Sequence, residues 1–165
     1  MIYVLIGESG SGKDTIAKEL SKLGYKQVIS YTTRPPRYKG EDTHIFITPE
    51  EVKNYELAAY TMYDGYEYFS TPQQIRESDI YILDRVGLDS FKTHGYPHRV
   101  IYIEVPEDIR ESRMKGRGDK EPLERILHDR EAFTNIRYDY KIPNIDLQNA
   151  VDRIVDIIKW EKEKV

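Results

Sequence analysis

The stretch Gly7–Asp14, which reads G-E-S-G-S-G-K-D and is followed by Thr15, decides the expected fold. The apolar run at 2–6 before it is typical of a short buried strand, and apolar side chains recur at helical spacing along 13–23 after it. The spacing G-x-x-x-x-G-K has chemical meaning when it lies between a strand and a helix. The stretch therefore predicts a phosphate-binding loop in an α/β protein.

The chemistry of such a loop depends on its backbone. Glycines let several N–H groups turn inward around phosphate oxygens, and the following helix adds partial positive charge at its N-terminus. Lys13 is placed to reach the β and γ phosphates of ATP. The residues expected to contact ATP are Gly7, Ser9, Gly10, Ser11, Gly12, Lys13, Asp14 and Thr15.

Two carboxylates are candidate ligands for the Mg²⁺ that would accompany ATP as co-substrate. Asp14 stands where the motif usually has Ser or Thr, and it could hold the ion directly or through water. It could equally be an acidic residue that stabilises the first helical turn. Asp84 ends the apolar run Y-I-L-D, a position that suits a carboxylate near Mg²⁺ or an ordinary polar residue after a strand.

The composition bounds the class of protein. The chain has 165 residues, 33% of them charged, and a net charge of -4, which favours one domain and argues against a dedicated nucleic-acid binder. Cysteine is absent, so disulfides and thiolate metal sites are excluded, as fits a reducing cytoplasm. The apolar run at 2–6 is too short for a signal peptide or a membrane span. We expect a cytoplasmic monomer or homodimer without membrane or nucleic-acid partners.

Strands that alternate with helices predict a sandwich around a parallel sheet. Further strands are expected at 28–30, 80–83, 100–105 and 138–142, and helices at 106–115, 122–137 and 147–160. The segment 31–73 differs in character, because it alternates in short runs such as 44–47 and carries many Tyr, Thr and Pro residues. It predicts an inserted lobe of small strands with one short helix that begins near Pro49.

Four further segments carry a family resemblance. They are 30–37 (S-Y-T-T-R-P-P-R), 65–71 (G-Y-E-Y-F-S-T), 116–118 (G-R-G) and 138–144 (Y-D-Y-K-I-P-N). With the phosphate loop they occur in family order across nearly the whole chain, and together they resemble the guanylate kinases. The resemblance implies one P-loop NTPase domain, a three-layer sandwich with a central parallel sheet. Its expected parts are a core at 1–30, 79–112 and 138–165, an acceptor-binding lobe at 31–78 and a mobile lid at 113–137.

The resemblance also implies which residues bind the phosphoryl acceptor. Arg34 and Arg37 would grip its phosphate, and the Tyr68 hydroxyl would donate to the same group. The residues implied at the base pocket are Ser30 and Ser70. The two arginines also suggest this role by themselves, because two guanidinium groups held close by two prolines form a rigid dicationic clamp. A solvated basic loop would have the same sequence pattern.

The same resemblance implies which residues of the lid contact ATP and the transferring phosphoryl group. Arg113, Arg117 and Arg125 flank a turn rich in glycine and charge, and they would close on ATP and the transferring phosphoryl group as catalytic residues. A charged helix surface is the alternative for these arginines. Asn144 would lie near the adenine end of ATP.

The chain departs from the family pattern where guanine is read. The positions of the family's two acids fall on Ala59 and Val86, which removes the acceptors for the N1–H and 2-amino groups of guanine. A shifted alignment could let Glu56, Asp64 or Glu67 substitute.

His44 replaces a family tyrosine after a shortened loop, and could be a phosphate or ribose ligand or simply a half-buried histidine. The G-K-D of the phosphate loop and this shortened loop also resemble ribose 1,5-bisphosphate phosphokinases.

The expected function is ATP-dependent phosphoryl transfer to a nucleoside monophosphate, with GMP or dGMP giving GDP or dGDP. The alternative is a kinase for ribose 1,5-bisphosphate or another small phosphorylated acceptor. A third hypothesis is a non-catalytic binding module with a guanylate-kinase-like fold. The lysine and the lid arginines argue against it, because a pure binder needs neither.

Overall fold

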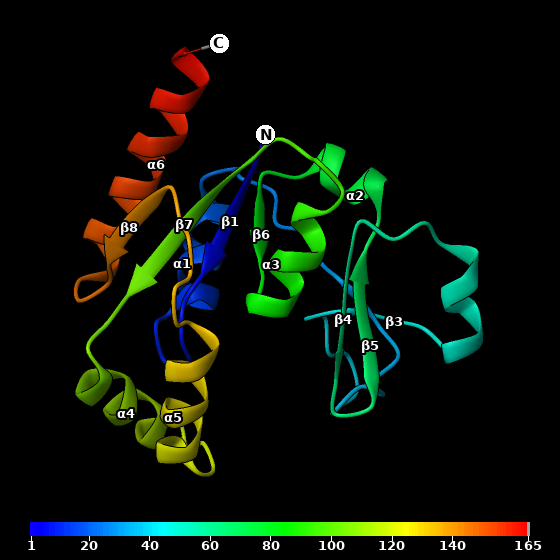
Figure 1. The fold of residues 1–165 in the computed structure, drawn as a ribbon, viewed down its shortest axis with the longest axis horizontal. Helices are drawn as coiled ribbons and strands as arrows, with labels where there is room; N and C mark the ends of the chain where they lie inside the picture. Colours follow the sequence, from blue (N-terminus) through cyan, green and yellow to red (C-terminus); the bar gives the residue numbers. More distant parts are fainter. Residues whose placement is uncertain (165) are drawn as a thin grey trace.

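A four-stranded parallel sheet forms the centre of the computed structural model, which describes residues 1–164 (Figure 1). The strand order is β6-β1-β7-β8, and every neighbouring pair is parallel. The strands are β1 (Ile2–Ile6), β6 (Ile80–Ile82), β7 (His98–Glu104) and β8 (Tyr140–Pro143). The predicted central parallel sheet is therefore confirmed.

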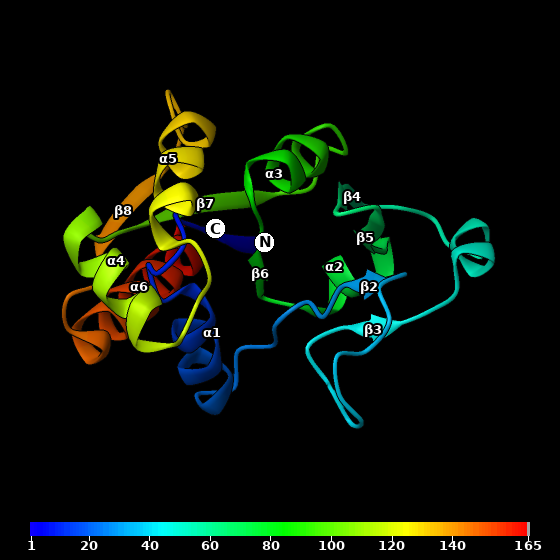
Figure 2. The ribbon, with the colours of Figure 1, turned by 90° about the horizontal axis from the view of Figure 1, so that it is seen from below.

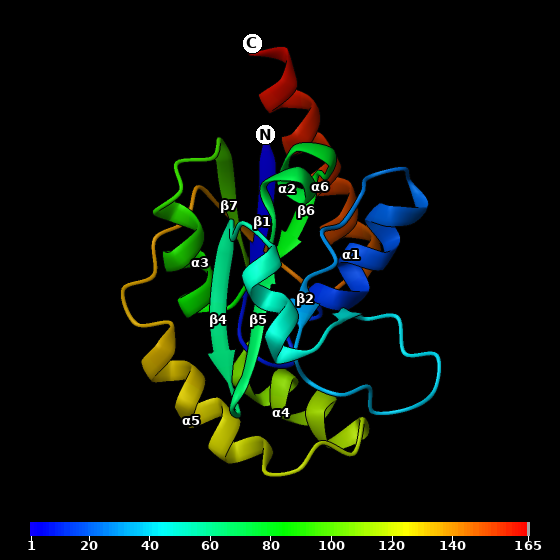
Figure 3. The same cartoon turned by 90° about the vertical axis from the view of Figure 1, so that its right-hand side faces the viewer.

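Helices cover both faces of this sheet, which explains why β1 is apolar throughout. Tyr3 and Leu5 pack with α1 (Lys13–Lys22) and α6 (Leu147–Glu163) in one core cluster. The alternating side chains of β1 point the other way, into a cluster that contains Leu88 and Phe91 of α3 (Arg85–Lys92). A strand that is buried on both faces reads as a continuous apolar run. Figure 3 shows the resulting layers, with α3 and α1 on opposite sides of the sheet.

A second sheet lies beside the core (Figure 2). Its strand order is β3-β2-β5-β4, with β2 and β3 parallel and the other pairs antiparallel. The strands are β2 (Tyr31–Thr32), β3 (Ile45–Phe46), β4 (Ala59–Tyr63) and β5 (Tyr66–Ser70). The turn between β4 and β5 has positive φ at Asp64 and Gly65, as tight hairpins require. The 3-10 helix η1 (Pro49–Asn54) and helix α2 (Pro72–Glu77) complete this part.

Two more helices, α4 (Glu107–Gly116) and α5 (Pro122–Ala132), pack against each other at the end of the core where β1 and β7 terminate (Figure 1). Ligands of open parallel sheets bind at this edge. The fold thus brings the phosphate loop, which follows β1, next to α4 and α5. Within residues 1–164 none of the helices combines the length and the apolar character that crossing a bilayer needs.

Three expectations about the elements were wrong. The strand expected at 28–30 is irregular, and the strand that follows it is β2, in the second sheet. The helix expected at 122–137 ends at Ala132, because the chain turns at Asn135, whose φ is 56°; the last strand accordingly starts only at Tyr140. In addition to these three, helices α2 and α3 were not expected at all.

Candidate active site

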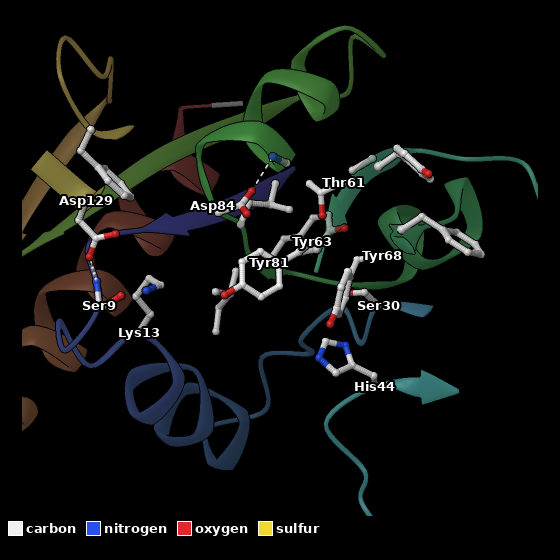
Figure 4. Close-up of a pocket in the computed structure, with 18 residues that line it drawn as sticks. Ser9, Lys13, Ser30, His44, Thr61, Tyr63, Tyr68, Tyr81, Asp84 and Asp129 are labelled. Carbon is white, nitrogen blue, oxygen red and sulfur yellow. Dashed lines mark hydrogen bonds between the residues drawn. The ribbon is translucent and has the colours of Figure 1, made fainter. Parts of the chain in front are cut away.

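A cavity of about 380 Å³ extends from the phosphate loop to the second sheet (Figure 4). Gly7, Ser9 and Lys13 line one end of it, and Ser30, His44 and Tyr68 line the other. Between and around them lie Ala59, Thr61, Tyr63, Tyr81, Asp84 and Asp129. Residues from both sheets and from α5 therefore face a single space.

The phosphate loop has the geometry that its glycines were expected to allow. Gly12 has a φ of 87°, and a Cβ added there would lie 2.4 Å from Asn144 Nδ2. A Cβ on Gly10, whose φ is 81°, would lie 2.8 Å from the carbonyl oxygen of Arg110. Only glycine fits both positions. The buried Oγ of Ser11 has no hydrogen-bond partner within the described residues, and a phosphate oxygen would supply one.

Asn144 and Arg113 hold this loop from the side away from the cavity. Asn144 Nδ2 donates to the Ser11 carbonyl oxygen (2.8 Å). Arg113 donates to the carbonyl oxygens of Gly10 (3.2 Å) and Asn144 (2.8 Å). Together with Thr15 they line a second cavity of about 350 Å³. In this structure Arg113 thus contacts the backbone of the loop and lines the second cavity with Arg117, whereas Arg117 and Arg125 also bind Asp119.

Removing the Asn144 amide should loosen the loop. In Asn144→Ala the buried carbonyl of Ser11 loses its donor, so we expect the free energy of unfolding to fall by about 1–3 kcal/mol. The KM for ATP should rise in the same variant. Chemical denaturation and ATP titration kinetics measure both effects, and Asn149→Ala, on the exposed side of α6, is the matched control. Unchanged stability and KM would contradict this role for Asn144.

Asp129 is a site residue that the sequence interpretation missed. Its Oδ2 accepts a hydrogen bond from the backbone N–H of Ser9 (2.8 Å), while Arg125 donates to Ser9 Oγ (3.0 Å). Both side chains come from one face of α5, four residues apart, and this spacing was the only signal available. Desolvation lowers the pKa of Lys13 in the same cavity, and the carboxylates of Asp14 and Asp129 oppose that shift.

Two of the expected lid arginines meet around one carboxylate. Asp119 accepts from Arg117 (2.5 Å) and from Arg125 (2.9 Å), and the hydrogen bond from Arg117 lowers the pKa of Asp119. Arg125 also reaches the phosphate loop through Ser9. Paired guanidinium groups that share an anion beside the loop are suited to the charge of a transferring phosphoryl group.

Arg34 lies near Tyr68 and His44 at the other end, where it is buried and paired with Glu41. Its Nη1 and Nη2 donate to the two carboxylate oxygens of Glu41 (3.2 and 2.9 Å), and the two side chains expose only 10% and 3% of their surface. The Nε of Arg34 is buried without a partner. Arg37 is exposed, and its backbone N–H also donates to Glu41 (2.8 Å). Glu41 therefore orients Arg34 and leaves one N–H free for a ligand.

His44 and Ser70 carry two further polar atoms that are buried without hydrogen-bond partners, Nδ1 and Oγ. The His44 ring packs edge-on against Tyr68, with ring centroids 5.4 Å apart. Burial lowers the pKa of His44, and the nearby Arg34 lowers it further, which favours the neutral imidazole. Buried polar atoms are nearly always paired, so unpaired atoms from Arg34, His44 and Ser70 indicate a place for a polar ligand.

The Arg34–Glu41 pair predicts a pH dependence of stability. The hydrogen bond from Arg34 lowers the pKa of Glu41 from 4.5 to about 2. A carboxylate whose pKa is lower in the folded state stabilises the fold above its unfolded pKa, and this contribution is lost as the pH falls towards 2. We expect Glu41→Gln to lower the melting temperature at pH 7 but to match the unaltered protein near pH 2.

Thermal unfolding at pH 7, 4.5 and 2.5 measures this difference, with the exposed Glu50→Gln as the control. A difference that stays constant over this range would show that the ion pair does not carry the effect.

The two candidate metal ligands lie in different settings. Asp84 lines the cavity and caps α3, where its Oδ1 accepts from the Gly87 N–H (2.7 Å). The other carboxylate oxygen of Asp84 does not take part in this cap. Asp14 is exposed in the first turn of α1. Among residues 1–164 no three His, Asp or Glu side chains gather into a site that could hold an ion by themselves. These oxygen donors fit Mg²⁺ that is also bound by nucleotide phosphates and water.

Several known proteins of similar sequence are named guanylate kinase. A family model described as an AAA domain matches residues 4–134. A guanylate kinase from Thermotoga maritima is 32% identical over 99% of this chain and 88% of the relative, and one from Clostridium acetobutylicum is 31% identical over 100% and 88%. The chain belongs to the guanylate kinase family and carries an AAA domain. The crystal structure of guanylate kinase from Anaplasma phagocytophilum has the same fold, with a TM-score of 0.67 at 24% identity over 98% of this chain and 85% of that one.

Guanylate kinases read guanine with two acids that this chain lacks. None of the three acids considered as their substitutes, which are Glu56, Asp64 and Glu67, lines the cavity. Glu67 accepts from the Tyr60 hydroxyl (2.9 Å), while Asp64 and Glu56 are exposed and lie outside the cavity wall. Ala59 lines the cavity, and Val86 is 61% exposed. The idea that one of these acids replaces the family's guanine readers thus finds no support in the geometry.

Proposed function

We propose that this guanylate kinase family member transfers the γ-phosphoryl group of ATP to a nucleoside monophosphate, with GMP and dGMP as its first substrates. The observation that carries the proposal is the single cavity that extends from Lys13 to His44, whose buried Nδ1 has no hydrogen-bond partner within the described residues. The curated relatives named guanylate kinase support the choice of acceptor.

ATP would bind around the phosphate loop. Its phosphates would take the backbone N–H groups, Lys13 and the free Ser11 hydroxyl, and its nucleoside would enter the second cavity beside Asn144 and Thr15. Mg²⁺ would be held by phosphate oxygens and by Asp84 or Asp14, partly through water, where it would neutralise phosphate charge.

The acceptor would bind with its phosphate at the other end of the cavity. Arg34 would donate from Nε, and Tyr68 and His44 would complete the contact. Arg117 and Arg125 would leave Asp119 for the transferring group as residues 113–137 close. Catalysis of this kind consists of positioning and of charge stabilisation in a space from which water is excluded.

A second acceptor, ribose 1,5-bisphosphate, is favoured by one observation. Asp84 is the single acid at the acceptor side of the cavity within residues 1–164, and one of its oxygens is already bonded to Gly87. A sugar phosphate needs no carboxylate to read a base. A non-catalytic module remains the third candidate, and it is disfavoured by the lid arginines that already contact Ser9 and Asp119.

The test is ADP release with Mg-ATP against GMP, dGMP, AMP, CMP, UMP and ribose 1,5-bisphosphate. Fastest turnover with GMP or dGMP is expected. Turnover with ribose 1,5-bisphosphate alone would support phosphoryl transfer from ATP but show that the acceptor is a sugar phosphate and not a nucleotide. No acceptor-dependent ADP release with any of the six would contradict the kinase proposal and favour the binding module.

A further inference from the structure

We propose that the acceptor end of the cavity reads a purine base through neutral hydroxyl groups, so that the protein phosphorylates IMP about as well as GMP. This inference rests on the proposed function and specifies its acceptor. GMP and IMP share the six-oxo group and the N1–H of the base. They differ only in the 2-amino group, which GMP alone carries.

The wall formed by β4 and β5 supplies the first evidence. Ala59 faces Ser70 and Thr61 faces Tyr68 across this antiparallel pair, so their side chains share one face. Ala59, Thr61 and Tyr68 line the cavity, and Figure 4 shows the Thr61 and Tyr68 side chains directed into it. These four side chains are neutral, and three of them carry a hydroxyl group.

Tyr81 adds a fourth hydroxyl from the core sheet. It is 2% exposed and lines the cavity, and Ser30 and Ser70 are close enough to lower its pKa against the effect of burial, although the Ser70 hydroxyl has no hydrogen-bond partner within the described residues. Burial raises the pKa of Tyr81 to about 12, so its hydroxyl keeps its proton at neutral pH. A hydroxyl can both donate to a base oxygen and accept from a base N–H. The group of Tyr81, Ser30 and Ser70 can therefore read the edge that guanine and hypoxanthine share.

Each acid near this wall already accepts a hydrogen bond from another residue. Asp129 is at the phosphate-loop end, where it accepts from Ser9. Glu67, on β5 opposite Met62, accepts a hydrogen bond from Tyr60, which lines the cavity. Asp84 lines the cavity beside Thr61, because Gly87 lies against both residues, and its Oδ1 caps α3. Within residues 1–164, the face of β4 and β5 that carries Ala59, Thr61, Tyr68 and Ser70 holds no carboxylate that could accept from the 2-amino group.

The expected selectivity for GMP over IMP depends on whether the site forms a hydrogen bond with the 2-amino group. A site built to hydrogen-bond a substrate group rejects an analogue without that group by about 10⁴-fold, because its own buried partner is left unpaired. Where the site offers no partner, that penalty does not arise. We therefore expect the kcat/KM for GMP to exceed that for IMP by less than about thirtyfold.

The experiment compares kcat/KM for GMP and IMP in the intact protein with saturating Mg-ATP. A ratio below about thirty supports the inference, and a larger ratio overturns it. Asp84→Asn is measured beside it, because a large ratio that collapses in this variant would show that Asp84 reads the 2-amino group. If neither nucleotide turns over, the proposed function itself is wrong. If GMP turns over and IMP does not, the proposed function holds and only this inference is wrong.

Two variants add a carboxylate to the β4–β5 wall, where it could accept a hydrogen bond from the 2-amino group of GMP. Ala59→Glu and Thr61→Glu each place a carboxylate on the wall, so both are expected to raise the GMP to IMP ratio at least tenfold where the protein folds. Met62→Glu is the matched control, since Met62 is on the same strand, points to the other side and is 60% exposed. It should leave the ratio unchanged. Thermal unfolding identifies misfolded variants, and an unchanged ratio in a folded Thr61→Glu protein would contradict the inference.

Discussion

Replacing Lys13 by alanine is expected to lower kcat by about a thousandfold or more while the protein stays folded. Lys13 lines the cavity at the phosphate loop, and Asp14, Asp129 and Glu8 surround it closely enough to affect its pKa. Without its ammonium group, the charge that develops on the transferring phosphoryl group would lose its nearest fixed cation.

Acceptor-dependent ADP release measures this loss. Lys18→Ala is the matched control, because Lys18 is exposed on the same helix and should be dispensable. Circular dichroism and thermal unfolding show whether both variants fold. Near-normal kcat in a folded Lys13→Ala protein would exclude the proposed phosphoryl transfer.

The second large effect is expected for Arg34→Ala, which should lower kcat/KM for the acceptor by about 10²- to 10³-fold. Orientation would be lost together with binding, so kcat should fall and the acceptor KM should rise. The loss also leaves the buried Glu41 carboxylate without its partner, which adds a stability cost.

Arg34→Lys separates these contributions. It keeps a positive charge near Glu41 but cannot donate from two nitrogens to the carboxylate and from a third to a phosphate. We expect it to recover stability but little of the kcat/KM. Arg76→Ala, at the exposed end of α2, is the control. Equal acceptor kinetics in Arg34→Ala and the unaltered protein would contradict the phosphate clamp.

The core of the fold could be predicted because its determinants are local. A buried parallel strand, a glycine-rich loop with one possible geometry and an amphipathic helix follow one another within the first 23 residues. Helix α3 has only eight residues, with Leu88 and Phe91 at helical spacing on its buried face, and its cap Asp84 was assigned to metal binding by the sequence interpretation, so the helix escaped prediction. Strand β2 has two residues, too few for any periodicity to appear.

The site was harder to predict, because its contacts join distant parts of the chain. Asp129 lies 120 residues from Ser9, and no motif marks it. Glu41 was passed over as part of a polar loop, although it holds Arg34 through two hydrogen bonds.

The most direct test of the central claim, that one cavity passes a phosphoryl group from ATP to a nucleotide, follows the group itself. The protein is incubated with Mg²⁺, ATP labelled at the γ-phosphate and GMP, and the products are separated by chromatography. We predict that the label moves into GDP in step with ADP formation, and that Lys13→Ala abolishes the transfer. Label that stays in ATP, or that is released only as inorganic phosphate, would contradict the account.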